Sequence, residues 1–304
     1  MTEARHGSSP LTMTSSSFAS GKMILSGEYA VVFGYPGIAV PTPFGVGVTW
    51  EDSGASPMTI IEKGLIGDEA YARKIVNLCI EKGSPSTGTI TINNQIFVGR
   101  GVGSSTALVI AICRCLLGED SKDDALEIEN TVNPGNSGLD FAVIWANHPV
   151  SFIKGKTPEP VTLNLNFLKH MTLMDTGKPG ETTAELVAWM TLRQAQGDKS
   201  VLHALETIGK CTGRLLAGED LKTVMRDHHR AQVSLGVVTK AAQDLISEIE
   251  KIGGSAKVLG AGARTGDGGM VLALAHETKI LERICAQHNY EFMTSAKDPM
   301  SEKM

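Results

Sequence analysis

The sequence predicts an α+β protein with two domains. Its 304 residues exceed the usual size of a single domain. Residues 19–50 alternate apolar runs with Gly and Pro, as strands and turns do. Residues 69–83 instead carry the apolar spacing of an amphipathic helix, and further helices are expected over residues 199–253.

Composition and charge narrow the classes of function. Apolar residues make up 42% of the chain and charged residues 20%, which is typical of a soluble globular protein. The formal net charge of -5 argues against a nucleic-acid partner, because a phosphate backbone requires a basic face. No apolar run reaches the length of a membrane span, and the N-terminus lacks the apolar segment of a signal peptide. We therefore expect a cytoplasmic protein that binds neither nucleic acid nor membrane.

Cysteine usage agrees with that compartment. The five cysteines are odd in number and scattered, and no spacing among them matches a zinc site. Cys113 and Cys115 lie two positions apart on an expected helix, so their side chains point in different directions. We expect reduced thiols in the core.

The chain is organised around residues 98–117, which read VGRGVGSSTALVIAICRCLL. Glycines at alternate positions precede Ser104, Ser105 and Thr106, and a small apolar run follows. This pattern predicts a glycine-rich loop that leads into the first turn of a buried helix. Backbone N–H groups and the positive end of a helix dipole together suit phosphate oxygens. No Lys follows the last glycine, so this is not a Walker A loop; the competing interpretation is a flexible turn before a core helix.

Polar residues interrupt the otherwise apolar first segment at Lys22, Ser26, Glu28 and Tyr29. A Lys and a Glu within a strand-rich core segment are costly unless they are paired or face a site. One interpretation is an ion pair between Lys22 and Glu28 at a strand end, and this does not exclude a functional role.

The middle of the chain carries two further acidic candidates. Ser121 is expected to cap a helix over residues 122–131, which carries Glu129 near its end. A second glycine-punctuated loop follows and ends in Asp140. Residues 142–155 are expected to form a strand, a turn and a second strand.

A Pro-containing polar stretch at 155–166 marks the expected domain boundary. Beyond it we expect a strand, a helix capped by Thr182 or Thr183, and three more helices. A strand, a glycine loop, a strand and a helix follow, and a short strand at 290–293 ends the pattern. We therefore divide the chain into a disordered tail (1–17), an N-terminal domain (18–160) and a C-terminal domain (161–304).

Three segments resemble, in order, the signature motifs of the GHMP kinases. They are GKMILSGEYAVVFGYPGIAVP at 21–41, GRGVGSSTA at 99–107 and KVLGAGARTGDGGMVLAL at 257–274. Two intermediate segments, ENTVNPGNSGLDFAV at 129–143 and DTGKPGETTAELV at 175–187, are similar to the mevalonate-kinase branch of that superfamily. The resemblance covers most of the chain, from Phe18 to the last helix.

The resemblance implies a GHMP kinase fold, in which an N-terminal domain similar to domain 2 of ribosomal protein S5 joins a ferredoxin-like C-terminal domain. The active site would lie between them. The implied activity is ATP- and Mg²⁺-dependent phosphorylation of mevalonate on its 5-hydroxyl. Phosphoryl transfer requires neutralised phosphate charge and an oriented acceptor oxygen, which suits the residue types at these loops.

The implied site residues follow position by position. Asp140 would be the catalytic base, with Lys22 as its partner. Ser105 and Glu129 would hold Mg²⁺. The nucleotide would be bound by Gly99, Arg100, Gly101, Val102, Gly103, Ser104, Ser105 and Thr106, and the substrate by Glu28, Tyr29, Thr183 and Gly262.

The sequence departs from the family pattern at several positions. Ser20 replaces the usual Pro before Gly-Lys, and the third motif is lengthened around residues 264–267. Tyr29 stands where animal mevalonate kinases carry His, and a Tyr there is common in phosphomevalonate kinases. Phosphomevalonate kinase is therefore the rival assignment, with Arg100 and Lys178 as candidate cations for a phosphorylated acceptor.

Two broader assignments are also compatible with the resemblance. They are another small-molecule GHMP kinase and a non-catalytic protein of the same fold; a homodimer is possible in each case.

Because His228 and His229 are adjacent on an expected helix, they cannot both face one site, and we expect them to be at the surface or partly buried. Trp145 and Trp189 are expected to be core or interface aromatics.

Overall fold

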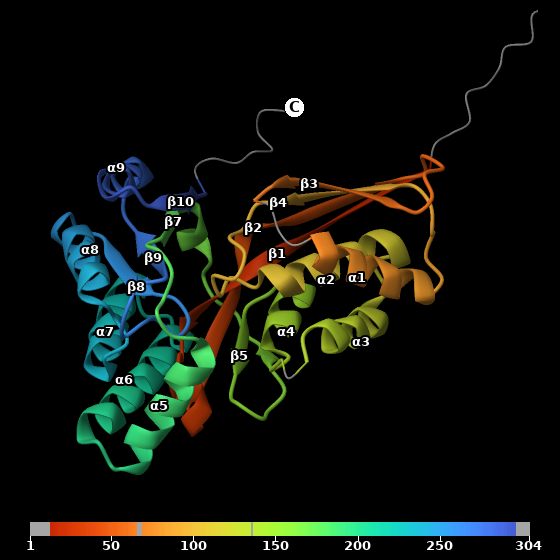
Figure 1. Cartoon of the computed structure of the whole chain (residues 1–304). Coiled ribbons are helices and arrows are strands. Elements are labelled where there is room, and N and C mark those ends of the chain that lie inside the picture. Colours follow the sequence, from red (N-terminus) through yellow and green to blue (C-terminus); the bar gives the residue numbers. More distant parts are fainter. Residues whose placement is uncertain (1–12, 66–68, 135, 296–304) are drawn as a thin grey trace, which may run out of the picture.

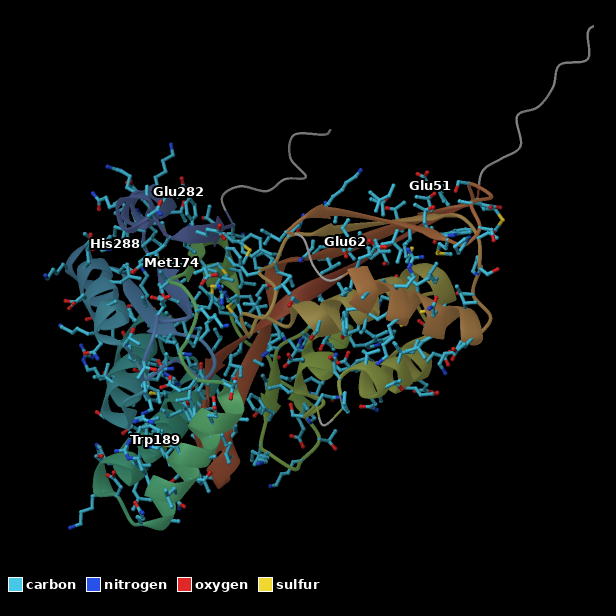
Figure 2. The ribbon with its side chains drawn as sticks, viewed as in Figure 1. Glu51, Glu62, Met174, Trp189, Glu282 and His288 are labelled. Carbon is cyan, nitrogen blue, oxygen red and sulfur yellow. The ribbon has the colours of Figure 1, made fainter. Side chains whose placement is uncertain are left out.

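The computed structural model describes residues 13–65, 69–134 and 136–295. Figure 1 shows two bodies side by side, each built from a β-sheet with helices packed against it. Strand β1 runs diagonally from the N-terminal body toward the C-terminal helices. The labelled residues Glu51 and Glu282 lie at opposite ends of the molecule (Figure 2). Within the described residues, none of the helices combines the length and apolar character that crossing a membrane requires.

The N-terminal sheet is mostly antiparallel. Its strands are β1 (Thr14–Ser26), β2 (Gly37–Glu51), β3 (Thr59–Gly64), β4 (Thr89–Asn94), β5 (Val150–Phe152) and β6 (Glu159–Pro160). They are ordered β3-β4-β2-β5-β6, with β1 also paired to β2 and with β3 parallel to β4. Along β4, buried Ile90 and Ile92 alternate with half-exposed threonines, so one face of the sheet carries the core.

The described helices of this domain are α1 (Glu69–Glu81), α2 (Ser104–Leu117), α3 (Lys122–Val132) and α4 (Leu139–Ala146). Helix α2 lies between β1 and β2 on one side and α1, α3 and α4 on the other. The consecutive residues Ile110, Ala111 and Ile112 are therefore all fully buried. The predicted buried helix after the glycine loop is confirmed.

The C-terminal sheet consists of β7 (Met171–Asp175), β8 (Ser255–Val258), β9 (Met270–Leu274) and β10 (Glu291–Thr294). Its order, β10-β7-β9-β8, is antiparallel throughout, which is the strand order of a ferredoxin-like domain. Its helices are α5 (Thr183–Ala195), α6 (Lys199–Leu216), α7 (Leu221–Leu235), α8 (Lys240–Lys251) and α9 (Thr278–His288). The predicted α+β class is confirmed.

The two domains interlock where β1 ends. The short 3₁₀ helix η1 (Ala30–Phe33) follows β1, and a second one, η2 (Asn166–His170), precedes β7. Tyr29 and Ala30 are buried in a cluster with Leu186, Ile208 and Leu235 of the C-terminal helices. The N-terminal segment thus contributes to the core of the other domain.

The chain is ordered earlier than predicted. Strand β1 begins at Thr14, so the predicted tail of residues 1–17 is wrong for 14–17, while 1–12 lie outside the described residues. Ser15 and Ser17 donate hydrogen bonds from their hydroxyls to the carbonyls of Cys115 and Ala111 in α2, at 2.7 and 2.6 Å. Small polar residues suit this strand because the neighbouring helix satisfies their hydroxyls.

Two local predictions in the middle of the chain are also wrong. Residues 139–146 form helix α4 rather than a strand, because the positive φ of Gly138 and of Asn147 delimit one short apolar run. Such runs do not distinguish a buried helix from a strand. Ser121 does precede α3, but its hydroxyl donates to the carbonyl of Gly118 and does not cap the helix.

Both histidines of α7 are buried, which corrects the prediction of a surface or partly buried pair. His228 is 0% and His229 8% exposed. Helix α7 packs against α6 on one side and β8 on another, so neighbouring positions around the helix are both covered.

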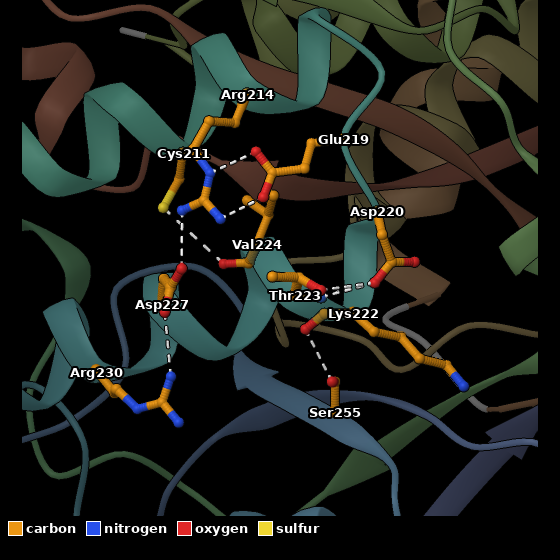
Figure 3. A network of polar contacts seen from close by, with 10 residues as sticks. All are labelled: Cys211, Arg214, Glu219, Asp220, Lys222, Thr223, Val224, Asp227, Arg230 and Ser255. Atoms are coloured by element: carbon orange, nitrogen blue, oxygen red, sulfur yellow. Dashed lines mark hydrogen bonds and ion pairs between the residues drawn. The ribbon is translucent and has the colours of Figure 1, made fainter.

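Polar contacts fix the connection between α6 and α7. Arg214 pairs with Glu219 and with Asp227, and Asp220 caps α7 by accepting a hydrogen bond from the backbone N–H of Thr223 at 3.0 Å (Figure 3). All five cysteines are buried and form no disulfide, as expected of reduced core thiols.

Thr182, one of the two predicted caps, caps helix α5 through a capping box with Glu185.

Candidate active site

The predicted phosphate loop is an open cradle at the N-terminus of α2. Gly99, Gly101 and Gly103 have φ values of 70, 73 and 77°, a region that favours glycine. A Cβ on Gly99 or Gly101 would meet nothing within 4 Å, so the space above the loop is free for a ligand. On Gly103 a Cβ would lie 2.9 Å from Ile144 and 3.0 Å from the side chain of Lys22. The loop therefore presents its backbone and the positive end of the α2 dipole to solvent.

The loop is attached to β1 at a bulge. The register between β1 and β2 shifts between Ser20 and Lys22, and the backbone N–H of Lys22 donates to the carbonyl of Val102 at 2.8 Å. A Cβ on Gly21 would lie 2.8 Å from that same carbonyl oxygen. Close backbone approach at Gly21 thus directs the side chain of Lys22 under the phosphate loop.

Lys22 meets Asp140, as predicted. The Lys22 Nζ to Asp140 Oδ1 distance is 3.1 Å, and the lysine is buried while the carboxylate is partly exposed. Asp140 lies in the first turn of α4, whose helix dipole favours a negative charge at this end. The ion pair between Lys22 and Glu28, the other interpretation, is not formed. The arrangement places an oriented carboxylate and a cation together at the edge of the cradle.

Glu129 lies behind the cradle. It is buried, and its Oε1 accepts a hydrogen bond from the hydroxyl of Thr106 at 2.8 Å, while its buried Oε2 has no hydrogen-bond partner among the described residues. Burial raises the pKa of Glu129, and the negative charge of Asp140 raises it further. An orphaned carboxylate oxygen beside a second carboxylate is the kind of position that a hard cation satisfies. The residues present therefore fit Mg²⁺.

The metal position would not be complete from side chains alone. Across the described ranges, no group of three or more His, Cys, Asp or Glu residues could hold a metal ion. Remaining ligands would have to come from hydroxyls, water or the phosphates of a nucleotide. Ser105, the other predicted ligand, is the second residue of α2 and precedes Thr106.

An apolar cavity of about 280 Å³ opens on one side of the cradle, and the sequence did not reveal it. Val46, Leu65, Tyr71, Ile92 and Leu108 supply its apolar walls, and Ser104 and Ser105 line the end nearest the cradle. These residues come from β2, β4, α1, α2 and the segment after β3, so no local pattern marks them. A nucleotide base is a flat, largely apolar ring, and an apolar cavity next to a phosphate site is what it requires.

A second cavity of about 110 Å³ lies between the two domains. Its walls combine the phosphate loop at residues 99–101 with Thr183 of α5 and the third glycine loop at residues 259–262. The structure thus brings two predicted substrate residues, Thr183 and Gly262, to the predicted nucleotide loop.

The other two predicted substrate residues are buried and bonded to protein groups. The hydroxyl of Tyr29 donates to the carbonyl of Ala261 in the third glycine loop at 2.5 Å. Tyr29 also has a φ of 63°, which is rare for a residue with a side chain. Glu28 pairs with Lys257 and lies 3.0 Å from Nε2 of His228. Tyr29 thus supports the wall of the interdomain cavity at Ala261.

Lys257 and His228 were not identified as site-supporting residues from sequence. Each is 0% exposed. Burial alone would raise the pKa of Glu28, but the charge of Lys257, together with the contact with His228, outweighs it and lowers the pKa to about 2. A lone Lys in the buried strand SAKV was the available signal, because a buried charge requires a partner.

The lengthened third loop is bonded to the loop before α5. The carboxylate of Glu181 accepts hydrogen bonds from the backbone N–H groups of Arg264 and Thr265 and from the Thr265 hydroxyl, at 2.9–3.3 Å. The guanidinium of Arg264 stacks over the ring of Trp189 at 4.1 Å. Figure 2 labels this tryptophan on α5. The insertion therefore fixes one wall of the interdomain cavity.

Comparisons with known proteins agree with this geometry. No protein-family model matches the chain. The mevalonate kinase of Pyrococcus horikoshii is 30% identical over 302 residues, which cover 84% of this chain and 87% of the relative. The mevalonate kinase of Thermococcus sibiricus is 27% identical over 303 residues, covering 85% and 88%.

Solved structures share the fold. The Methanococcus jannaschii mevalonate kinase superposes with a TM-score of 0.76 at 18% identity, covering 94% of this chain and 97% of that one. The Lactococcus lactis galactokinase, complexed with galactose, gives 0.64 at 14% identity and covers 92% of each chain. The chain therefore has the fold of the GHMP kinases. Within that superfamily, the chain belongs to the mevalonate kinase family.

The buried histidines predict acid lability. Burial lowers the pKa of His228, and Lys257 lowers it further; burial also lowers the pKa of His229 to about 4. Both folded pKa values lie below the usual 6.5, so the unfolded chain binds more protons as pH falls through 6.5. The free energy of unfolding should be highest above pH 7. It should decrease as the pH drops below 6.5, with a slope approaching about 2.7 kcal/mol per pH unit. Below pH 4.5 protonation of unfolded Glu28 extends the loss.

Urea unfolding at pH 7.5, 6.5, 5.5 and 5.0 measures this slope. His229→Asn should reduce the slope by the contribution of one proton, about 1.4 kcal/mol per pH unit. His203→Asn, which removes an exposed histidine of α6, should leave it unchanged. A free energy of unfolding that is flat between pH 7.5 and 5.0 would contradict the assignment.

Proposed function

We propose that the protein transfers a phosphoryl group from ATP to the 5-hydroxyl of mevalonate. The observation that carries the proposal is the Lys22–Asp140 pair at the edge of the glycine cradle. A carboxylate held by a neighbouring ammonium group can orient an acceptor hydroxyl and accept its proton. The phosphate cradle lies on the other side of Lys22, since Lys22 also bonds the backbone of Val102.

The nucleotide uses two features of α2. Backbone N–H groups of residues 99–106 and the helix dipole bind the phosphates, and the adjacent apolar cavity accepts the base. The amide NH₂ group of Asn133 lines this cavity and has no hydrogen-bond partner among the described residues, so it is a donor for the edge of that base.

Glu129 and Ser105 are the residues that would hold Mg²⁺. Magnesium, when bound, neutralises part of the phosphate charge. Glu129 contributes the oxygen that is otherwise buried without a partner, and Thr106 fixes the orientation of its carboxylate. Asp140 then remains available to the acceptor hydroxyl, because Lys22 rather than the metal holds it.

Mevalonate is favoured over phosphomevalonate as the acceptor. Relatives that match most of the chain carry the name mevalonate kinase. Among the described residues that line the interdomain cavity, Arg100 is the one cation. Asp175 pairs with it, and Glu181 lines the same cavity. Lys178, the other candidate cation, is exposed. A dianionic acceptor would need several cationic groups, so this charge balance suits a singly charged substrate.

A substrate panel tests the assignment. An ADP-release assay with mevalonate, phosphomevalonate, homoserine and galactose should give a kcat/KM for mevalonate at least ~10²-fold above that for each of the other three, about the effect of one charged contact. Equal or higher efficiency with phosphomevalonate would reverse the assignment. Turnover of homoserine or galactose alone would replace it with another GHMP activity.

The role of Asp140 is tested by Asp140→Asn, which retains size and removes the negative charge. We expect kcat to fall by about 10²–10⁴-fold with little change in ATP binding, since this is the usual contribution of a general base. Asp124→Asn, which removes a carboxylate of α3 paired with Lys82, is the matched control and should retain full turnover. Turnover of Asp140→Asn within a few-fold of the wild type would remove Asp140 from the mechanism.

A further inference from the structure

Arg100 occupies an unusual place in the phosphate loop. It stands between Gly99 and Gly101, whose left-handed backbone lifts it to the tip of the loop. No added Cβ at either glycine would meet another group within 4 Å, so the tip is open on both sides. The loop thus presents a side chain with a permanent positive charge directly at the predicted phosphate position.

A carboxylate of the other domain holds this arginine. Nε of Arg100 donates to Oδ2 of Asp175 at 2.7 Å, and Asp175 is the last residue of β7. The side chain of Asp175 is 9% exposed and that of Arg100 27%. Oδ1 of Asp175 also accepts the backbone N–H of Gly177 at 3.0 Å, so the carboxylate is fixed at both oxygens. Its position therefore determines where the guanidinium lies.

The contact with Asp175 uses only the inner nitrogen of the guanidinium. Within the described part of the chain, the terminal nitrogens of Arg100 have no hydrogen-bond partner. The residue lines the interdomain cavity together with Thr183 and the third glycine loop. A guanidinium that is anchored through Nε and free at its terminal nitrogens presents a fork that matches two oxygens of a phosphoryl group.

The other cation at the cradle is committed elsewhere. Nζ of Lys22 pairs with Asp140 on the acceptor side. The loop carries no Lys after its last glycine, so the backbone, the helix dipole and Arg100 are its sources of positive potential.

We propose that Arg100 is a catalytic residue that binds the transferred phosphoryl group, and that Asp175 is the positioning residue that presents it. The inference rests on the proposed kinase function and extends it. The bond between the γ-phosphorus and the ADP oxygen breaks as the acceptor oxygen forms its bond to phosphorus, and Asp140 takes the acceptor proton. The terminal nitrogens of Arg100 donate to phosphoryl oxygens throughout and neutralise charge that moves toward ADP.

The arrangement also couples the two domains. The arginine comes from the loop before α2 and the aspartate from the C-terminal sheet, so the guanidinium is correctly placed only when the domains are held together. The same contact supports the wall of the cavity in which the acceptor and the phosphates meet.

Four variants test the proposal: Arg100→Ala, Arg100→Lys, Asp175→Asn and the control Arg230→Ala. The last removes an exposed arginine of α7 that pairs with Asp227, away from the cavity. We expect Arg100→Ala to lower kcat by ~10²-fold, below the largest effects known for arginines in phosphoryl transfer. Arg100→Lys should recover little, because an ammonium group cannot both hold Asp175 and fork toward the phosphoryl group. Asp175→Asn should lower kcat by about tenfold.

Chemical rescue separates a catalytic from a structural role. Added guanidinium ion at millimolar concentration should restore part of the kcat of Arg100→Ala and none of that of Asp175→Asn. Turnover of Arg100→Ala within about threefold of the wild type would overturn the proposal. So would a large loss without rescue that is accompanied by a lowered Tm, since this would make the contact a structural one only.

Nucleotide binding without any acceptor keeps this test independent of the substrate assignment. Titration of the full chain with ATP and with ADP should show that Arg100→Ala weakens ATP binding by ~10-fold and leaves ADP binding unchanged, because only ATP carries the γ-phosphoryl group. If the wild type fails to phosphorylate mevalonate, the proposed function fails, and this ratio still supports or overturns the role of Arg100. Equal effects on ATP and ADP would overturn it.

Discussion

The structure depends on one buried ion pair, between Glu28 in the turn after β1 and Lys257 in β8. Nζ of Lys257 also donates to the carbonyl of Ile24 at 3.1 Å, and His228 of α7 contacts the second carboxylate oxygen. Two charges that are this deeply buried are costly unless each satisfies the other. The pair therefore requires that β1 of the N-terminal sheet and β8 of the C-terminal sheet remain adjacent.

Several features of the site follow from that adjacency. The turn after Glu28 carries the strained backbone of Tyr29, whose hydroxyl bonds the third glycine loop at Ala261. Strain of this kind persists where surrounding contacts determine it. On the other side, the bulge at Gly21 carries Lys22 toward Asp140 and ties β1 to the phosphate loop. A single strand thus joins the third glycine loop, the proposed base and the cradle.

Part of the candidate site could be predicted from the local chemistry of short sequence segments. The alternating glycines before Ser104 indicated a cradle, because no other residue adopts those backbone angles without strain. Lys22 stood out as a charge in an apolar segment, although its pairing with Asp140 followed from the family resemblance, and Thr182 was one of two candidate caps of α5. For the cradle and the cap, a short stretch of sequence contained the physical reason.

The rest depended on contacts between distant segments. The apolar cavity beside α2 has walls from five parts of the chain, each of which looks like ordinary core. Asp175 gave no sign of its partner Arg100, 75 residues away, because an acidic residue at a strand end is usually solvated. The burial of His228 and His229 was missed because only the packing of α7 between two neighbours determines it.

A double-mutant cycle at Glu28 and Lys257 tests the central claim most directly. The free energy of unfolding would be measured for Glu28→Met, Lys257→Met and the double variant. We expect each single variant to lose about 3–5 kcal/mol, because it leaves an uncompensated buried charge, and the double variant to lose no more than the worse single one. Two losses that simply add would contradict it, since the charges would then not depend on each other.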